Sequence, residues 1–156
     1  MDLYLIQHGE AVRQEEDPER PLTEKGAASI KKTAAFLKRS QQKIHLVWHS
    51  GKKRAQQTAE ILVETLGTGI HPESAAGLGP NEDVAVIREK IAAASQDSLA
   101  LVGHMPHLSY LASQLLTGDQ KKEIIRFRNA GILCLSGENQ DWKLAWMITP
   151  EMIPES

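Results

Sequence analysis

The chain has 156 residues, of which 41% are hydrophobic and 24% are charged, and we expect them to form one domain spanning residues 1–156. The formal net charge of −2 argues against general affinity for nucleic acid. No apolar stretch is long enough to span a membrane, and the N-terminus lacks a signal-peptide pattern. Because Cys134 is the only cysteine, no disulfide can form within the chain. We therefore expect a cytoplasmic protein with neither nucleic-acid nor membrane partners.

The first predicted element is a short apolar strand over residues 2–6, which leads into Gln7, His8, Gly9 and Glu10. If this strand belongs to a parallel sheet, it delivers His8 to the carboxyl edge of the sheet, where α/β proteins bind ligands. Glycine next to the imidazole lets backbone N–H groups approach a small anion closely. The sequence therefore makes His8 a candidate functional residue.

A charged loop over residues 13–20 separates this strand from a helix that Thr23 is expected to cap. The next strand candidate covers residues 45–48, and a second helix follows it. Ser50 is suited to the N-cap of that helix, and Arg54 falls in its first turns, where the helix dipole favours anions.

A third helix is predicted over residues 84–94 and a further strand over residues 98–102, which ends in Gly103 and His104. Pro106 is suited to the first turn of a fourth helix, because its missing N–H would be unpaired there. The last predicted elements are a hairpin of strands at residues 132–135 and 143–148. This alternation predicts an α/β fold in three layers, with a mostly parallel sheet and helices on both faces.

Several motifs in this order resemble the histidine phosphatase superfamily, and in particular its small SixA-type phosphohistidine phosphatases, whose fold is phosphoglycerate mutase-like. The resemblance covers residues 3 to about 147. It is carried by the strand ending in His8-Gly9-Glu10, by Leu22-Thr23-x-x-Gly26, by Ser50-x-x-x-Arg54-Ala55-x-Gln57-Thr58-Ala59 and by Val102-Gly103-His104. The chain departs from the family at one position, because Gln7 stands where the family has arginine.

The resemblance implies a site in which His8 attacks phosphorus and forms a covalent phosphoenzyme. Arg54 would hold phosphoryl oxygens, and a protonated His104 would donate to another oxygen. Gln7 would complete the phosphate pocket, with no metal or other cofactor. The substrate would be a phosphohistidine-bearing protein or a small phosphate ester, acted on by a monomer.

The proton donor is open at this point. Glu82 precedes the third predicted helix in a loop that could overhang the pocket, so it is a candidate general acid. In the alternative interpretation, Glu82 and Asp83 are simply the charges at the N-terminus of that helix.

Gln7 predicts a weakened phosphatase, because its amide can donate hydrogen bonds but carries no charge. Arg13, Arg126 and Arg128 are candidates to replace the missing charge. Two other functions stay open: a module that binds phosphate or phosphohistidine without turnover, and a small-molecule phosphomonoesterase or mutase of the same fold.

Overall fold

Six strands form one mixed sheet in the order β3-β2-β4-β1-β5-β6 in the computed structural model, which describes residues 1–155. The strands are β1 (Asp2–Gln7), β2 (Leu46–His49), β3 (Glu73–Ser74), β4 (Ser98–Gly103), β5 (Ile132–Glu138) and β6 (Asp141–Ile148). The pairings among β1, β2, β3 and β4 are parallel, whereas β5 runs antiparallel to both β1 and β6. The predicted α/β class and mostly parallel sheet are confirmed.

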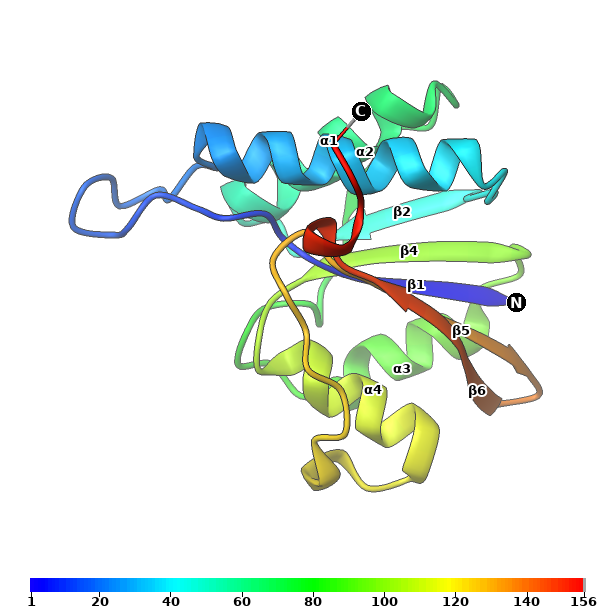
Figure 1. The fold of residues 1–156 in the computed structure, drawn as a ribbon. Coiled ribbons are helices and arrows are strands. Elements are labelled where there is room, and N and C mark those ends of the chain that lie inside the picture. The colour runs from blue at the N-terminus through cyan, green and yellow to red at the C-terminus, as the bar shows by residue number, and fades with distance from the viewer. Residues whose placement is uncertain (156) are drawn as a thin grey trace.

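Helices cover both faces of the sheet (Figure 1). On one face lie α1 (Glu24–Arg39) and α2 (Lys53–Leu66), and on the other lie α3 (Val84–Ala93) and α4 (His107–Thr117). Two short 3-10 helices, η1 (Gln120–Lys122) and η2 (Pro150–Met152), complete the described part. No helix within residues 1–155 has the length and apolar character needed to cross a membrane.

The central strand β1 supplies both hydrophobic cores, because successive side chains on a strand point to opposite faces. Leu3 and Leu5 pack in the core that contains the buried residues of α3 and α4. Tyr4 and Ile6 pack in the core that contains the buried residues of α1 and α2. Burial on both faces explains why this strand is a continuous apolar run.

The predicted hairpin is confirmed, with strands that are longer than expected. Its two-residue connection is Asn139–Gln140, and both residues have positive φ, 53° and 65°. This is the conformation of a type I′ turn, whose twist matches that of the paired strands. Cys134 on β5 is buried, as an inert thiol should be.

Two predicted helix starts are wrong by a few residues. Ser50 is not an N-cap, because α2 begins at Lys53 and its N-cap position is Lys52. The Ser50 hydroxyl instead contacts His104, a residue that the sequence pattern of α2 cannot reveal. Pro106 lies directly before α4, which begins at His107, rather than in its first turn. The elements β3, η1 and η2 were not predicted, since two or three residues carry no periodic signal.

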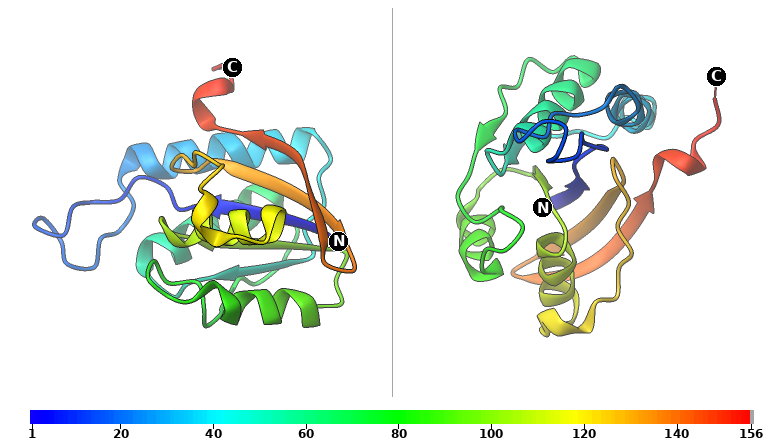
Figure 2. Two further views of the ribbon diagram at one scale, coloured as in Figure 1. Left: turned by 90° about the horizontal axis from the view of Figure 1, so that it is seen from below. Right: turned by 90° about the vertical axis from the view of Figure 1, so that its left-hand side faces the viewer.

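The carboxyl ends of β1, β2 and β4 meet at one edge of the sheet, and a long loop over residues 9–23 projects from that edge (Figure 1). The right-hand view of Figure 2 looks onto this edge from the loop side. The loop closes against the start of α1, where Thr23 Oγ1 accepts a hydrogen bond from Gly26 N at 3.0 Å. Residues from the ends of three neighbouring strands can therefore act together.

Glycine is required where this loop leaves β1 and enters α1. A Cβ at Gly26 would overlap the backbone carbonyl oxygen of Glu10, and a Cβ at Gly9 would lie 2.8 Å from the carbonyl oxygen of Gly26. A side-chain rotation cannot relieve either contact, because the added Cβ would meet backbone atoms in both cases. The two glycines therefore let the strand end and the helix start touch.

We expect Gly26→Ala to lower the free energy of unfolding by about 1–3 kcal/mol, because the added methyl group must push backbone apart. Urea denaturation monitored by circular dichroism measures this loss. Lys25→Ala, one residue earlier and exposed, is the control and should change the stability by no more than about 0.5 kcal/mol. Wild-type stability in Gly26→Ala would contradict the close approach.

Candidate active site

Two histidines meet at the carboxyl edge of the sheet, one after each of two paired strands. His8 follows β1 and His104 follows β4, and the ring centroids are 5.0 Å apart with the ring planes inclined by 53°. The backbone N–H of His8 donates to the carbonyl oxygen of Gly103 at 3.1 Å, which extends the β1–β4 pairing to the site. The structure thus brings together two of the residues selected from the sequence.

The His8 ring has a defined tautomer and is neutral at physiological pH. Its Nδ1–H donates to the backbone carbonyl of Gly9 at 2.6 Å, so the lone pair is on Nε2. Burial lowers the pKa of His8 to about 4 against the opposing effect of the Gly9 carbonyl, and Arg54 and Arg20 lower it further. A neutral imidazole with a free Nε2 lone pair is the form that a nucleophile needs.

The backbone around His8 is held by groups from two other parts of the chain, helix α2 and the segment that precedes β5. Gly9 N donates to Thr58 Oγ1 at 3.0 Å, and Thr58 Oγ1 donates to Arg54 O at 2.7 Å. The side-chain amide of Asn129 donates to His8 O at 3.0 Å. These bonds fix the position of the imidazole relative to the start of α2, which carries Arg54.

His104 forms a hydrogen bond with Ser50, which follows β2. His104 Nε2 lies 2.6 Å from Ser50 Oγ, and this oxygen also accepts from Lys52 N at 3.3 Å. In the tautomer in which this hydroxyl donates to Nε2, the ring proton is on Nδ1, which is buried and has no partner within residues 1–155.

His104 is neutral in the free site, and the expectation of a protonated ring concerns the complex with a phosphoryl group. Burial, followed by the nearby His8 and Arg54, lowers the pKa of His104 to about 3. The sequence analysis assigned the proton from what a bound phosphoryl group would favour, whereas the free pocket is already rich in cations. Neutral His104 still offers its Nδ1–H as a donor.

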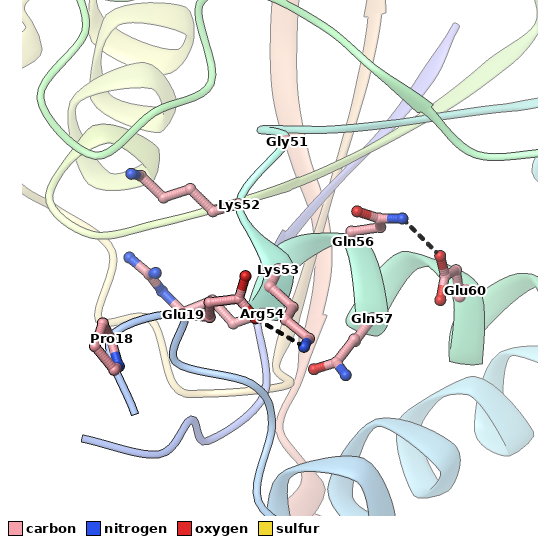
Figure 3. Close-up of a pocket in the computed structure, with 9 residues that line it drawn as sticks. All are labelled: Pro18, Glu19, Gly51, Lys52, Lys53, Arg54, Gln56, Gln57 and Glu60. Carbon is pink, nitrogen blue, oxygen red and sulfur yellow. Dashed lines mark hydrogen bonds and ion pairs between the residues drawn. The ribbon is translucent and has the colours of Figure 1, made fainter. Parts of the chain in front are cut away.

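Arg54 lies in the first turn of α2, where the helix N-terminus also favours anions. Its Nε is buried without a protein partner. Burial, followed by the charge of Arg20, lowers the pKa of Arg54, yet a guanidinium stays charged at physiological pH. In Figure 3 the Arg54 guanidinium and the Lys52 ammonium extend to the same side of this helix end.

Gln7 occupies the last position of β1, and its side-chain Oε1 is buried without a partner. Together with Arg54 Nε and His104 Nδ1, it makes three unpartnered buried polar atoms on residues at this edge. Most buried polar atoms in proteins are hydrogen-bonded, so each exception needs an explanation, of which a catalytic or binding role is one. Two of the three are donors suited to an anion.

Glu82 and Asp83 both form hydrogen bonds within the segment that leads into α3. Glu82 Oε2 accepts from Gly79 N at 2.6 Å, and Asp83 Oδ1 accepts from Ala85 N at 2.9 Å as the cap of α3. Both side chains are exposed. The interpretation of Asp83 as a helix-terminal charge is therefore confirmed, and Glu82 closes its own turn.

Among the candidate replacement arginines, Arg13 forms an exposed ion pair with Glu16 at 3.1 Å, and Arg126 and Arg128 are exposed. The sequence analysis missed Arg20, whose charge acts on both His8 and Arg54. Its position in the sequence could have identified it, because Arg20 directly precedes Pro21-Leu22-Thr23, a motif that resembles the family pattern. This motif lies at the end of the loop.

A groove of about 550 Å³ adjoins Arg54 but includes neither histidine (Figure 3). Its walls are mainly polar or charged, and they are Pro18, Glu19, Gly51, Lys52, Lys53, Arg54, Gln56, Gln57 and Glu60. The groove is open to the surface beside the first turns of α2. Within residues 1–155, no group of three or more His, Cys, Asp or Glu side chains is placed to hold a metal ion.

Known proteins resemble this chain in both sequence and fold. Residues 3–78 match the family model of the histidine phosphatase superfamily (branch 1). An uncharacterized protein of Picosynechococcus sp. is 35% identical over 141 residues, which are 86% of this chain and 84% of that protein. Phosphohistidine phosphatase SixA of Escherichia coli is 28% identical over 123 residues, 76% of each chain. The structure of a protein histidine phosphatase SixA complexed with tungstate superposes with a TM-score of 0.84 at 25% identity, covering 96% of this chain and 97% of that one.

We expect NMR titration of the free protein to show His8 and His104 neutral down to about pH 5, because their pKa values lie at about 4 and about 3. In the urea-unfolded protein the histidines should titrate near pH 6.5, as free side chains do. Since the unfolded chain then binds more protons, the stability should fall as the pH drops through the range from about 6.5 to about 4. A folded-state titration of His8 near pH 6.5 would contradict the description of the site.

Proposed function

Because the chain belongs to the histidine phosphatase superfamily, as one of its SixA-type members, we propose that it removes the phosphoryl group from phosphohistidine on a partner protein. The proposed enzyme works as a monomer, forms a phospho-His8 intermediate and needs no metal or other cofactor. The observation that carries this proposal is the hydrogen bond from His8 Nδ1–H to Gly9 O, which leaves a neutral Nε2 beside the unpartnered donors of Arg54 and His104.

In the first step, the Nε2 lone pair attacks phosphorus and the bond from phosphorus to the substrate nitrogen breaks. The electron pair of that bond stays on the leaving imidazole, which takes a proton from solvent. Arg54 and His104 Nδ1–H donate to the phosphoryl oxygens, where negative charge is held through the transition state. The bound anion also raises the pKa of His104, so the imidazole can gain its second proton in the complex.

In the second step, a water molecule forms a bond to phosphorus and the bond from phosphorus to His8 Nε2 breaks. The water proton leaves with phosphate or solvent, and the His8 lone pair is restored. His8 Nδ1–H remains bonded to Gly9 O in both steps, so the ring needs no reorientation.

A protein substrate is supported by the surroundings of the site and by the relatives. The open, mainly polar groove beside Arg54 can receive the segment that carries a phosphohistidine. Among the similar proteins, SixA of Escherichia coli is named as a phosphohistidine phosphatase. An alternative follows from Gln7: a phosphohistidine-binding module without turnover would need the donors of the pocket but not the full positive charge.

The decisive assay compares the wild type, His8→Ala and Gln7→Arg for release of phosphate from a phosphohistidine-bearing protein. We expect turnover by the wild type, none by His8→Ala and faster turnover by Gln7→Arg. One charge-assisted hydrogen bond is worth about 1.5–3 kcal/mol. The rate of Gln7→Arg should therefore exceed the wild-type rate by no more than a few hundredfold. Phosphate binding without wild-type turnover, together with turnover in Gln7→Arg, would establish the binding module instead.

We expect Glu82→Gln to keep at least half of the wild-type rate on phosphohistidine, because Glu82 bonds to Gly79 N and an imidazole can be protonated by solvent as it leaves. The same variant is assayed with an aryl phosphate, whose oxygen leaving group gains more from an acid. A large loss on both substrates would make Glu82 the proton donor, and no loss on either would remove it from the chemistry.

A further inference from the structure

The loop over residues 9–23 leaves the active-site edge and folds back on itself, and its hydrogen bonds place Arg20 near that edge again. Val12 N donates to Pro21 O at 2.8 Å, and Arg20 Nε donates to Val12 O at 3.0 Å. Ala11 and Leu22 form an isolated antiparallel bridge next to them. The loop is therefore a hairpin-like arm, and Arg20 lies on its returning strand opposite the residues that follow His8.

The first turns of α2 hold the two flanks of Arg20. On one side, Glu19 Oε2 pairs with Lys53 Nζ at 3.2 Å (Figure 3). On the other, Leu22 N donates to Gln57 Oε1 at 2.7 Å. Lys53 and Gln57 lie one helical turn apart and bracket Arg54 along the helix. These two contacts hold the arm against the first turns of α2, and the charge of Arg20 is close enough to act on Arg54.

Arg20 is held in an uncommon state for a surface arginine. Its backbone φ is 49°, in the left-handed region that non-glycine residues rarely adopt. It forms no ion pair with any carboxylate of residues 1–155, although the arm is rich in acidic residues. Four of these acidic residues have other partners: Glu10 with Thr23, Glu16 with Arg13, Asp17 with the N–H of Glu19, and Glu19 with Lys53.

The result is a pair of arginines whose charges both act on His8 and which form no ion pair within residues 1–155. Burial is the largest cause of the lowered pKa values of His8 and Arg54, and the charge of Arg20 acts in the same direction on both. Like charges repel at short range, and an anion bound between them removes that repulsion. Strain and unneutralised charge at one position are typical of a ligand site.

We propose that Arg20 replaces the arginine that the chain lacks at position 7 and supplies the second guanidinium of the phosphoryl pocket. The proposal rests on the proposed phosphoryl site. Because Arg20 Nε is bonded to Val12 O, the two terminal nitrogens form the edge that can donate to phosphoryl oxygens. Gln7 then needs to contribute only neutral hydrogen bonds. The positive charge of the phosphoryl pocket comes instead from Arg20, which lies in the loop rather than on β1.

The test measures the affinity for inorganic phosphate by calorimetry in the wild type, Arg20→Gln, Gln7→Arg and the double variant. We expect Arg20→Gln to weaken binding at least tenfold and Gln7→Arg to strengthen it less than tenfold. In the Arg20→Gln background, Gln7→Arg should restore most of the lost affinity. Arg13→Gln, an exposed arginine of the same arm, is the control and should stay within twofold of the wild type.

Recovery of phosphate affinity by Gln7→Arg distinguishes a direct role of Arg20 in binding from a structural role. If Arg20→Gln only loosened the loop by removing the bond to Val12, an arginine at position 7 on β1 would not restore the loop or the affinity. NMR titration gives a second readout, in which His8 should titrate at higher pH in Arg20→Gln than in the wild type or Arg13→Gln. Wild-type phosphate affinity in Arg20→Gln, or equal loss with and without arginine at position 7, would overturn the proposal. A wild type that binds phosphate through Arg20 but hydrolyses no phosphohistidine would overturn the proposed function alone.

Discussion

β4 lies between β1 and β2 in the sheet, so the residues that follow these three strands emerge side by side. This strand order is the constraint on which the site depends. It places His8 against His104 and His104 against Ser50, although these residues are distant in the chain. The backbone bond from His8 N to Gly103 O continues the sheet into the site, so the geometry of the imidazoles is set by strand pairing rather than by a loop.

Burial and positive charge act together on the two imidazoles. Both remove the proton that a histidine would otherwise take up in mildly acidic solution. The site therefore combines positive charge with neutral imidazoles, which is what the proposed phosphoryl transfer needs. A solvated histidine beside the same arginines would lack the effect of burial, which is the largest contribution at both rings. The rigid core on either side of β1 is what makes that burial possible.

The sequence predicts the parts of this arrangement that repeat along the chain. Apolar runs identify β1 and β4, helical spacing identifies α1, and their alternation indicates the edge at which His8 and His104 lie. The role of Ser50 could not be predicted, because its hydroxyl is taken by an imidazole 54 residues away. Arg20 was missed for a similar reason, since its position depends on a loop that folds back through Val12 and on anchors in α2. The pattern of residues along one strand or helix does not reveal contacts between side chains that are distant in the sequence.

The bond between His8 Nδ1–H and Gly9 O also determines which isomer of phosphohistidine the enzyme itself can carry. The pros nitrogen is occupied by the backbone, so a phosphoryl group accepted by His8 belongs on the tele nitrogen, at the far end of the ring. A tele adduct extends away from the backbone that Nδ1 contacts, on the opposite side of the ring. The regiochemistry of the proposed covalent intermediate is therefore set by a single contact between neighbouring residues.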